Sequence, residues 1–427
     1  MVPHVIPRYD EAQVSDGLGV SVPAPGVAIT DRPAKERQNR PMTVRSSTAA
    51  AVLAPLMTLA LLTGCSKPAE PQVPPTPAAS STPAPSPSAP AVKTSGMKKD
   101  LAGFTTKLYT GKSVPSSGPA TQALKQSKAP KRAASVKAAT GTWKKEQFAV
   151  LTSGKDVTLV VKKKGTWTAV GGWWPSLGIK DAALGGKRHV LLMGSDAREK
   201  QGEKIDEARA DALQVVGVDG RGGGGVMGIP RDLWVPQANG RNAKINSALS
   251  TGGPTAQTKT VEKATGLPIQ GYVLTGFTGF QKMIDELDGI TINAPMKVRA
   301  VEKGKQQVDG YDAFWFTRER KTLPNGDFDR TSNQGIALAG IGAKAVAEGP
   351  AGLAKVLDIA DRHVSTNLSA EQALTFGAWA YQIDLKKMGH QVPTADYGRS
   401  ADGQSILEAT SATRKVFKDF ADGNLPK

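Results

Sequence analysis

The feature that most limits what this chain can fold into is a series of prolines in its first quarter. They stand at positions 68, 71, 74, 75, 77, 83, 85, 87 and 90. Proline fixes one backbone dihedral and lacks an amide hydrogen, so this stretch favours neither helix nor sheet, and it has little apolar surface to bury. We expect residues 65–96 to form an extended linker, which at roughly 3 Å per residue can span about 100 Å. A large folded domain is therefore expected only after it.

The longest apolar segment, residues 49–62, lies just before this linker. It is interrupted by Pro55 and is shorter than the ~20 residues that a membrane-spanning helix needs. A basic residue, Arg45, precedes it, and small residues follow it. This pattern is typical of an export signal, which we place at residues 42–64, with translation starting at Met42. Residues 1–41 are then interpreted as an extension that a misplaced start codon assigns to the chain.

The single cysteine of the chain ends this signal, in the order Leu62-Thr63-Gly64-Cys65. The order resembles a bacterial lipobox, so we predict that Cys65 is lipidated. The mature protein would then be extracytoplasmic, held on the cell membrane by a lipid anchor and facing the cell wall. The alternative is an ordinary secretory signal that happens to contain a cysteine.

Composition narrows the chemistry further. One cysteine excludes a disulfide framework, and four widely separated histidines offer no Cys/His metal cluster, so a metal would have to be a hard cation on carboxylates. The formal net charge of +17 suits nucleic acid, an anionic membrane surface or a phosphate-bearing substrate. The export signal disfavours cytoplasmic nucleic acid, so we expect no nucleic-acid partner.

Residues 97–186 are expected to form a small accessory module, with a β-meander over residues 141–175. Gly-containing turns at residues 153–154 and 164–165 separate three strand-like runs. Four tryptophans of the meander either fill its core, which we favour, or form a surface on which glycans stack: Trp143, Trp167, Trp173 and Trp174. The meander has no cluster of acids or arginines, so we predict that it is dispensable for the chemistry.

Residues 187–427 read as an α/β domain with a central mixed β-sheet flanked by helices. Strands are predicted at residues 189–193, 212–218 and 226–229. If the second and third strands form a hairpin and the first runs parallel to the third, six polar residues meet at one sheet edge. These residues are Asp196, Arg198, Arg209, Asp211, Arg231 and Asp232. Acids among arginines at strand ends are suited to binding a metal ion together with phosphates.

Further basic residues follow in the second half of this domain. The pattern predicts a helix over residues 277–287, a strand over 290–293, a strand over 314–317 and a helix from about Thr331. Arg318 and Arg320 would share one side of an extended chain. Arg330 would lie at the helix N-terminus with Gln334 one turn later, where backbone N–H groups also attract anions. Each arginine alone could be a solvated surface charge, but the set favours a shared anionic ligand.

Six segments, taken in order, resemble the LytR-CpsA-Psr family. They read HVLLMGSDAR, RADALQVVGVD, GIPRDLWV, KINSAL, GLPIQGYVLTGFTGF and FTRERKTLPNGDFDRTSNQG. The resemblance covers roughly residues 187–427. It implies an extracytoplasmic α/β phosphotransferase that moves a glycopolymer, such as teichoic acid, from a polyprenyl-pyrophosphate carrier to peptidoglycan. It also implies an apolar pocket for the prenyl tail, which the sequence does not locate.

The resemblance implies roles for individual residues. Asp196 and Asp211 match acids at a Mg²⁺ (or Mn²⁺) site, and with Arg209 they form the predicted catalytic group; Asp196 is a hypothetical general base. The predicted pyrophosphate-binding residues are Arg198, Arg231, Arg318, Arg320, Arg330 and Gln334. The sequence departs from the family pattern at Ala212, in place of Thr, and at Asn333 and Gly335, in place of Arg and Gln. Two other functions remain open, a pyrophosphatase with water as nucleophile and a non-catalytic wall- or lipid-binding protein.

Overall fold

The computed structural model describes residues 91–128, 130 and 133–425, all within one compact unit. The predicted signal, Cys65 and nearly all of the proline-rich linker lie outside these residues. In the part of the chain that is described, no helix is both long and apolar enough to cross a membrane.

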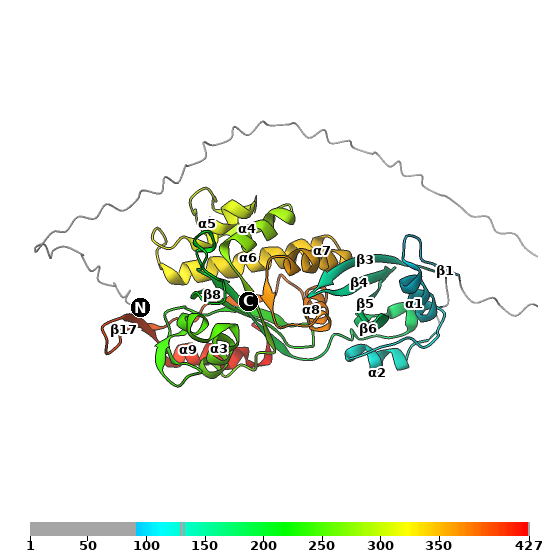
Figure 1. Ribbon diagram of the computed structural model, residues 1–427, viewed down its shortest axis with the longest axis horizontal. Coiled ribbons are helices and arrows are strands. Elements are labelled where there is room, and N and C mark those ends of the chain that lie inside the picture. The colour runs from blue at the N-terminus through cyan, green and yellow to red at the C-terminus, as the bar shows by residue number, and fades with distance from the viewer. Residues whose placement is uncertain (1–90, 129, 131–132, 426–427) are drawn as a thin grey trace, which may run out of the picture. The chain divides into compact units, whose positions relative to one another are not determined.

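A six-stranded mixed sheet forms the centre of the larger part of the molecule (Figure 1). Its strands, in spatial order, are β15 (Ser365–Thr366), β12 (Gly271–Thr275), β7 (Arg188–Ser195), β8 (Ala210–Val218), β9 (Gly224–Gly228) and β16 (Gly389–Gln391). β8 pairs antiparallel with both β7 and β9, so β7 and β9 run in the same direction, as the sequence predicts. β12 and β16 are parallel to their neighbours β7 and β9. The mixed sheet and the predicted hairpin are thus confirmed.

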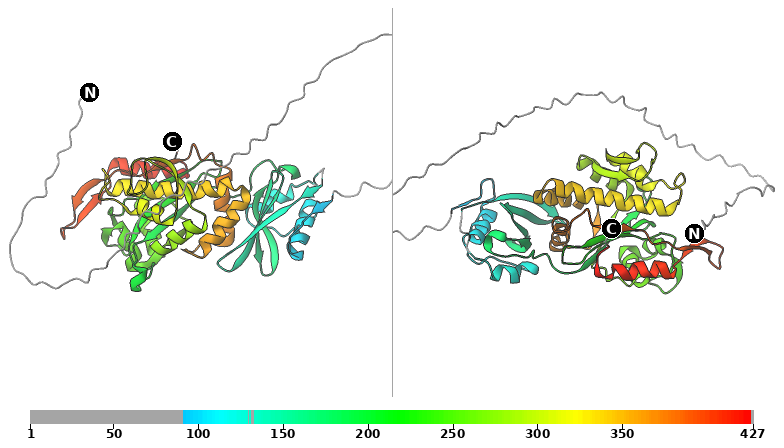
Figure 2. Two further views of the ribbon diagram at one scale, coloured as in Figure 1. Left: turned by 90° about the horizontal axis from the view of Figure 1, so that it is seen from above. Right: turned by 180° about the vertical axis from the view of Figure 1, so that it is seen from behind.

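Helices cover both faces of this sheet (Figures 1 and 2). On one face, alternate residues of β7 such as Leu191 and Met193 pack in one apolar cluster with residues of α3 (Ala248–Thr265) and α9 (Ser411–Asp419). On the other face, Val190 belongs to a second cluster with residues of α7 and α8. The helices on this second side are α6 (Asp327–Ala347), α7 (Pro350–Asp361) and α8 (Ala370–Gly377). Alternation along each strand therefore produces two separate cores.

The remaining elements of the α/β part are small sheets and further helices. Three two-stranded sheets are β10–β11 (Trp234–Pro236 and Asn242–Lys244), β13–β14 (Ile290–Ala294 and Gly304–Val308) and β17–β18 (Asp396–Arg399 and Ser405–Glu408). α4 (Phe277–Glu286) and β13 confirm the predicted helix over 277–287 and strand over 290–293. α6 begins four residues earlier than the predicted start at Thr331.

The predicted strand over residues 314–317 is wrong. These residues lie in the helix α5 (Gly310–Arg318). The Asp309 side chain accepts a hydrogen bond from the Asp312 backbone N–H (2.9 Å), which caps the helix. Ala313 and Phe316, three residues apart, are buried on one face. A local cap and this helical packing outweigh the strand preference of the aromatic run, so Arg318 ends a helix instead of sharing an extended strand with Arg320.

The accessory module is a four-stranded antiparallel sheet with helices on one side. Its strands are β3 (Lys137–Trp143), β4 (Glu146–Ser153), β5 (Asp156–Lys163) and β6 (Thr166–Trp173); α1 (Lys99–Tyr109), α2 (Pro119–Lys125) and a short parallel pair, β1 (Val92–Lys93) and β2 (Ala134–Ser135), complete it. The predicted meander is confirmed, with one additional strand, β3. Core packing of the tryptophans is also confirmed, since Trp143, Trp167 and Trp174 are buried and Trp173 is half-buried.

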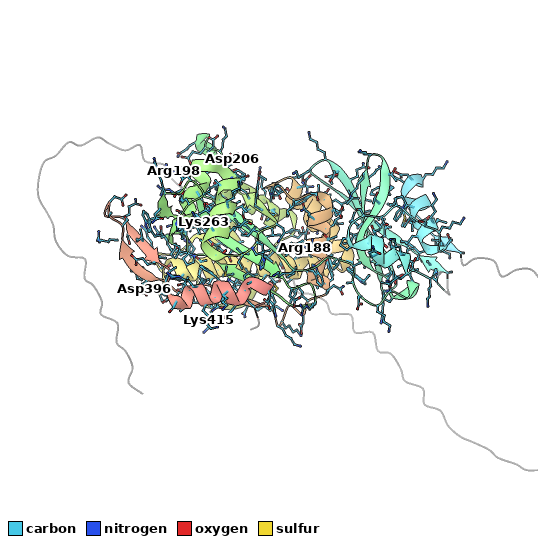
Figure 3. The ribbon with its side chains drawn as sticks, turned by 90° about the horizontal axis from the view of Figure 1, so that it is seen from below. Arg188, Arg198, Asp206, Lys263, Asp396 and Lys415 are labelled. Atoms are coloured by element: carbon cyan, nitrogen blue, oxygen red, sulfur yellow. The ribbon has the colours of Figure 1, made fainter. Side chains whose placement is uncertain are left out.

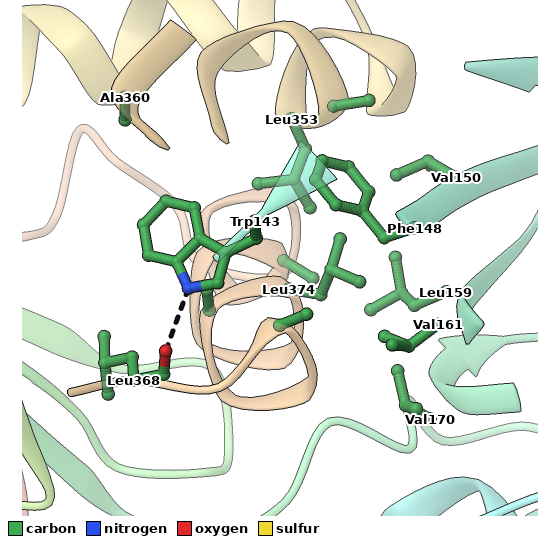
Figure 4. Close-up of a cluster of buried hydrophobic side chains, with 14 of the residues drawn as sticks. Trp143, Phe148, Val150, Leu159, Val161, Val170, Leu353, Ala360, Leu368 and Leu374 are labelled. Atoms are coloured by element: carbon green, nitrogen blue, oxygen red, sulfur yellow. Dashed lines mark hydrogen bonds between the residues drawn. The ribbon is translucent and has the colours of Figure 1, made fainter. Parts of the chain in front are cut away.

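The two faces of the module sheet pack against different partners. Ala149 and Leu151 of β4 face the core shared with α1, whereas Phe148 and Val150 join the cluster that contains Val190 of the central sheet. The second cluster also takes residues from α7 and α8 (Figure 4). One apolar core is therefore continuous between the module and the α/β part. This packing ties the module to the α/β part, and its dispensability for the chemistry stays a prediction.

Candidate active site

The two predicted catalytic acids lie at one edge of the central sheet. Asp196 directly follows β7, and Asp211 is the second residue of β8, which starts where β7 ends. The loop between them is closed by the backbone, because Asp196 N–H donates to the Arg209 carbonyl (3.0 Å). Arg209 N–H in turn donates to Asp196 Oδ1 (2.8 Å). The convergence of Asp196, Arg209 and Asp211 that the hairpin argument predicts is therefore present.

Two arginines hold Asp211 from the opposite side. Arg231 follows β9 and forms an ion pair through Nη1 with Asp211 Oδ2. Arg330, in the first turn of α6, places Nη1 3.6 Å from the same oxygen and donates from Nη2 to the Asp211 carbonyl (3.3 Å). Arg330 is only 4% exposed, so its charge is fixed in place and depends on buried partners.

Asp327 is a member of this network that the sequence reasoning missed. Its Oδ1 lies 2.6 Å from Arg330 Nη2 and 3.4 Å from Arg231 Nε. Burial raises the pKa of Asp327, and Arg330 and Arg231 oppose that rise. Asp327 and Arg330 are three residues apart, a spacing that would have revealed the pair had the helix been predicted to begin before Thr331.

Uncharged side chains complete the surroundings of Asp211. Gln334, one turn after Arg330, donates from Nε2 to the carbonyls of Asp211 (3.5 Å) and Thr317 (3.3 Å). Asn246 Nδ2 lies 3.4 Å from Asp211 Oδ1. Asn246 is buried and lies within the KINSAL segment, so only the family resemblance pointed to it.

The other predicted arginines are exposed. Arg198, Arg318 and Arg320 line the same cavity as the acids, and Figure 3 places Arg198 near Asp206, in the loop between β7 and β8. The Arg318 guanidinium lies over the rings of Phe277 (4.8 Å) and Phe314 (5.3 Å), which orients it without neutralising its charge. The Arg209 side chain is exposed and is not among the described residues that line the cavity.

The cavity has a volume of about 1330 Å³ and changes character along its length. Its charged end is lined by Asp196, Arg198, Asp211, Arg231, Arg318, Arg320, Arg330 and Gln334. Its apolar end is lined by Trp143, Val218, Leu353, Phe376, Trp379 and Ile383, among others. One continuous space thus joins a site for an anion to a site for a hydrocarbon.

Two elements run the length of this cavity. Every second residue of β8 from Ala212 to Val218 lines it, and Asp211 to Val218 spans about 23 Å at the rise of a strand. On α6, most residues from Gln334 to Ala345 line the cavity, and Arg330 to Ala345 spans about 22 Å at the rise of a helix. The cavity lies between the sheet face that carries Val190 and the helices that cover it.

Asp196 and Asp211 are the two acids at this site that could hold a hard divalent cation. Burial and the nearby Asp211 charge raise the pKa of Asp196, although the Arg209 N–H opposes this. Two carboxylates that repel each other beside an open anion site are suited to Mg²⁺ or Mn²⁺, which take one or two carboxylates and complete their shell with water and phosphate oxygens. Among the described residues, no group of three or more His, Cys, Asp or Glu is placed to hold a metal. Phosphate and water would supply the remaining ligands.

The fold and this site define an α/β protein whose cavity carries acids and arginines at one end and is suited to an anionic ligand. Residues 178–419 match the LytR_cpsA_psr family, and the chain belongs to that family. The four strands of the accessory-module sheet, β3 to β6, lie before the matched region.

Individual relatives are moderately similar. Regulatory protein MsrR of Staphylococcus aureus (strain COL) is 29% identical over 252 residues, which are 56% of this chain and 75% of MsrR. The polyisoprenyl-teichoic acid–peptidoglycan teichoic acid transferase TagU of Bacillus cereus (strain AH820) is 30% identical over 222 residues, 50% of this chain and 71% of TagU. The crystal structure of B. subtilis TagV has a TM-score of 0.48 and 26% identity, covering 56% of this chain and 99% of TagV.

Proposed function

We propose that this protein is a phosphotransferase that moves a glycopolymer from a polyprenyl-pyrophosphate carrier to peptidoglycan. The observation that carries the proposal is a continuous cavity, in which paired acids and arginines at one end adjoin an apolar lining at the other. A lipid-linked pyrophosphate has the same division between a double anion and a hydrocarbon. The relative TagU, which is named as a teichoic acid transferase to peptidoglycan, supports the same reaction class.

The arginines divide into two groups by burial. The exposed Arg198, Arg318 and Arg320 are free to clamp the pyrophosphate as it enters, because a guanidinium can make paired hydrogen bonds to phosphate oxygens. The buried Arg330 and the partly buried Arg231 are already paired with acids, so their main task is to hold Asp211 in place.

The transfer itself needs one bond to form and one to break. A sugar hydroxyl of peptidoglycan attacks the phosphorus that carries the glycopolymer, the bridging P–O bond breaks, and polyprenyl phosphate leaves. Such a step depends mainly on alignment and on compensation of charge. Asp196 is our candidate to accept the hydroxyl proton, since burial raises its pKa and Arg209 N–H fixes one of its oxygens. A Mg²⁺ ion held by Asp196 and Asp211 would supply compensation of the charge on the phosphate oxygens.

The proposed location is outside the cytoplasmic membrane. The lipobox-like order ending at Cys65 and the proline-rich linker support a lipid anchor with a reach of about 100 Å. A Cys65→Ala protein should leave the membrane fraction or remain unprocessed. A mature-sized Cys65→Ala protein that stays on the membrane would overturn the anchor.

The test of the reaction is reconstitution with a polyprenyl-pyrophosphate-linked oligosaccharide and purified peptidoglycan, in the presence and absence of Mg²⁺. Glycan attached to peptidoglycan together with released polyprenyl phosphate supports transfer. Glycan phosphate released into solution without attachment would instead indicate a pyrophosphatase. Binding of the substrate without turnover under all conditions would indicate a non-catalytic wall- or lipid-binding protein.

A further inference from the structure

One residue of the apolar end comes from outside the region that matches the family. Trp143 is the last residue of β3 in the accessory module, and it lines the cavity. It is 2% exposed, and its ring packs in the core that the module shares with α7 and α8 (Figure 4). The lining of the cavity is therefore incomplete without the module.

Trp143 is held rigidly by contacts between the two parts of the chain. Its Nε1 donates to the carbonyl of Leu368 (2.9 Å), as Figure 4 shows. The residues on either side of it are tied to α7, because Thr142 N–H donates to Asp358 (2.8 Å) and Lys144 N–H donates to Asp361 (2.7 Å). A buried ring with a satisfied donor and a fixed backbone has little freedom to move aside, so it acts as a wall.

The position of this wall follows from the sheet register. A Cβ placed on Gly271 would lie 2.4 Å from Leu368 Cδ2, so Leu368 packs directly on that residue of β12. Gly271 pairs with Val190, and Asp196, just past the end of β7, is six residues further along the chain, roughly 20 Å away at the rise of a strand. Trp143, bonded to Leu368, thus lies at the part of the cavity remote from the acids.

We propose that Trp143 limits how far a lipid tail reaches into the cavity, and so sets the preferred prenyl length. The inference rests on the proposed function, since it assumes that the apolar end receives the prenyl chain. It assigns to the accessory module a part in substrate selection. Removing the indole opens space toward the module core, whereas adding bulk at Ala360, which also lines the cavity close to Trp143, shortens the space.

The experiment measures binding and does not require turnover. Geranyl, farnesyl, geranylgeranyl and undecaprenyl monophosphates are titrated into the wild type, Trp143→Leu and Ala360→Phe by calorimetry in mild detergent. In Trp143→Leu the affinity of the longest phosphates relative to the shortest should rise at least about tenfold, since each further buried methylene adds affinity. In Ala360→Phe the same ratio should fall.

Trp174→Leu is the matched control. Trp174 is also a fully buried tryptophan of the module, but it packs toward α1 and α2, donates to Thr158 Oγ1 (2.8 Å) and does not line the cavity. The Trp174→Leu variant should have a lower melting temperature than the wild type and the same dependence of affinity on prenyl length.

The outcomes separate the two proposals. If the wild type binds prenyl phosphates and both Trp143→Leu and Ala360→Phe show the same length dependence as the wild type, the role of Trp143 is overturned but the lipid site is not. No binding of any prenyl phosphate by the wild type would overturn the lipid site, and with it both proposals. If Trp143→Leu fails to fold, the Ala360→Phe ratio decides, and an unchanged ratio there overturns the inference.

Discussion

The charged and apolar ends of the cavity are stabilised in different ways. At the charged end, Asp211, Arg231, Asp327 and Arg330 compensate one another, so each buried charge depends on the others. At the apolar end, the lining comes from both the module and the α/β part, and no single contact dominates. Removing one partner of a buried ion pair leaves the other charge buried and uncompensated. Exchanging one apolar side chain for another of similar volume changes the stability little. The effects of substitutions at the two ends should therefore differ, both in magnitude and in whether they act on turnover, stability or binding.

The largest effect is expected from Asp211→Asn. The change removes the counter-charge of Arg231 and one of the two carboxylates at the proposed cation site, so turnover should fall about a hundredfold or more, with partial rescue at high Mg²⁺. The measurement is kcat on a polyprenyl-pyrophosphate glycan with graded Mg²⁺. Asp219→Asn, in the turn between β8 and β9, is the control and should keep full activity. Full activity of Asp211→Asn in the presence of EDTA would contradict a metal-assisted mechanism.

Arg330→Ala should have the largest effect on stability. It leaves the buried Asp327 without its nearest cation, and loss of one partner of a buried pair costs about 3–5 kcal/mol. The free energy of unfolding in urea is measured for Arg330→Ala and for the double variant Arg330→Ala/Asp327→Asn. The double variant should recover part of the lost stability without recovering activity. An Arg330→Ala protein as stable as the wild type would mean that the charges at this end are not interdependent.

Arg318→Ala should act on binding instead. Arg318 is exposed and has aromatic neighbours, so its loss should raise KM about tenfold, the scale of one charge-assisted hydrogen bond, and leave kcat and stability nearly unchanged. Arg318→Lys should recover only part, since an ammonium cannot reproduce the guanidinium fork. Arg414→Ala on the exposed side of α9 is the control. Equal kinetics for the Ala and Lys variants would exclude a paired phosphate contact.

A smaller effect concerns pH. Burial and Asp211 raise the pKa of Asp196, so the folded protein keeps this proton to a higher pH than the unfolded chain does. This group therefore lowers stability as pH rises from the ordinary carboxyl pKa through the raised value. Without metal, Asp196→Asn should melt a few degrees higher than the wild type at neutral pH, and the difference should shrink in acid. Thermal melts across this pH range are the measurement. Added Mg²⁺ should raise the melting temperature of the wild type and leave that of Asp196→Asn unchanged.

The smallest effect is expected at the junction with the module. Asp358→Ala removes the acceptor for Thr142 N–H and Oγ1, which should cost about 1 kcal/mol of stability and leave kcat unchanged. Asp402→Ala, in an exposed turn, is the control for urea unfolding. A loss of turnover in Asp358→Ala would show that the junction also shapes the charged end.

Much of the charged end could be predicted because strand ends impose their geometry locally. The apolar runs ending at Asp196 and Arg231, with Asp211 at the start of the intervening strand, suffice to bring these residues to one edge. The sequence pattern puts Arg318 after a strand, because the aromatic run before it favours a strand, whereas the helix that Asp309 caps extends to Arg318. Asp327 was missed because its role depends on where α6 begins, and helix ends are the least certain part of a pattern.

The apolar end could not be predicted from the sequence. In the sequence its lining residues look like ordinary core residues. Only tertiary packing decides which of them fill the core and which line the cavity. Trp143 shows this, since its burial was predicted correctly while its place beside α7 depends on contacts more than 200 residues away along the chain, such as that with Leu368.

The continuous core around Phe148, Val190 and Leu353 also bears on how the protein folds. The family match begins at residue 178, but the packing does not divide there, so we expect that the start of the match is not a boundary of cooperative unfolding. A chain cut near that point would expose the apolar faces of β4 and α7 at once. The module and the α/β part should therefore unfold together as one unit.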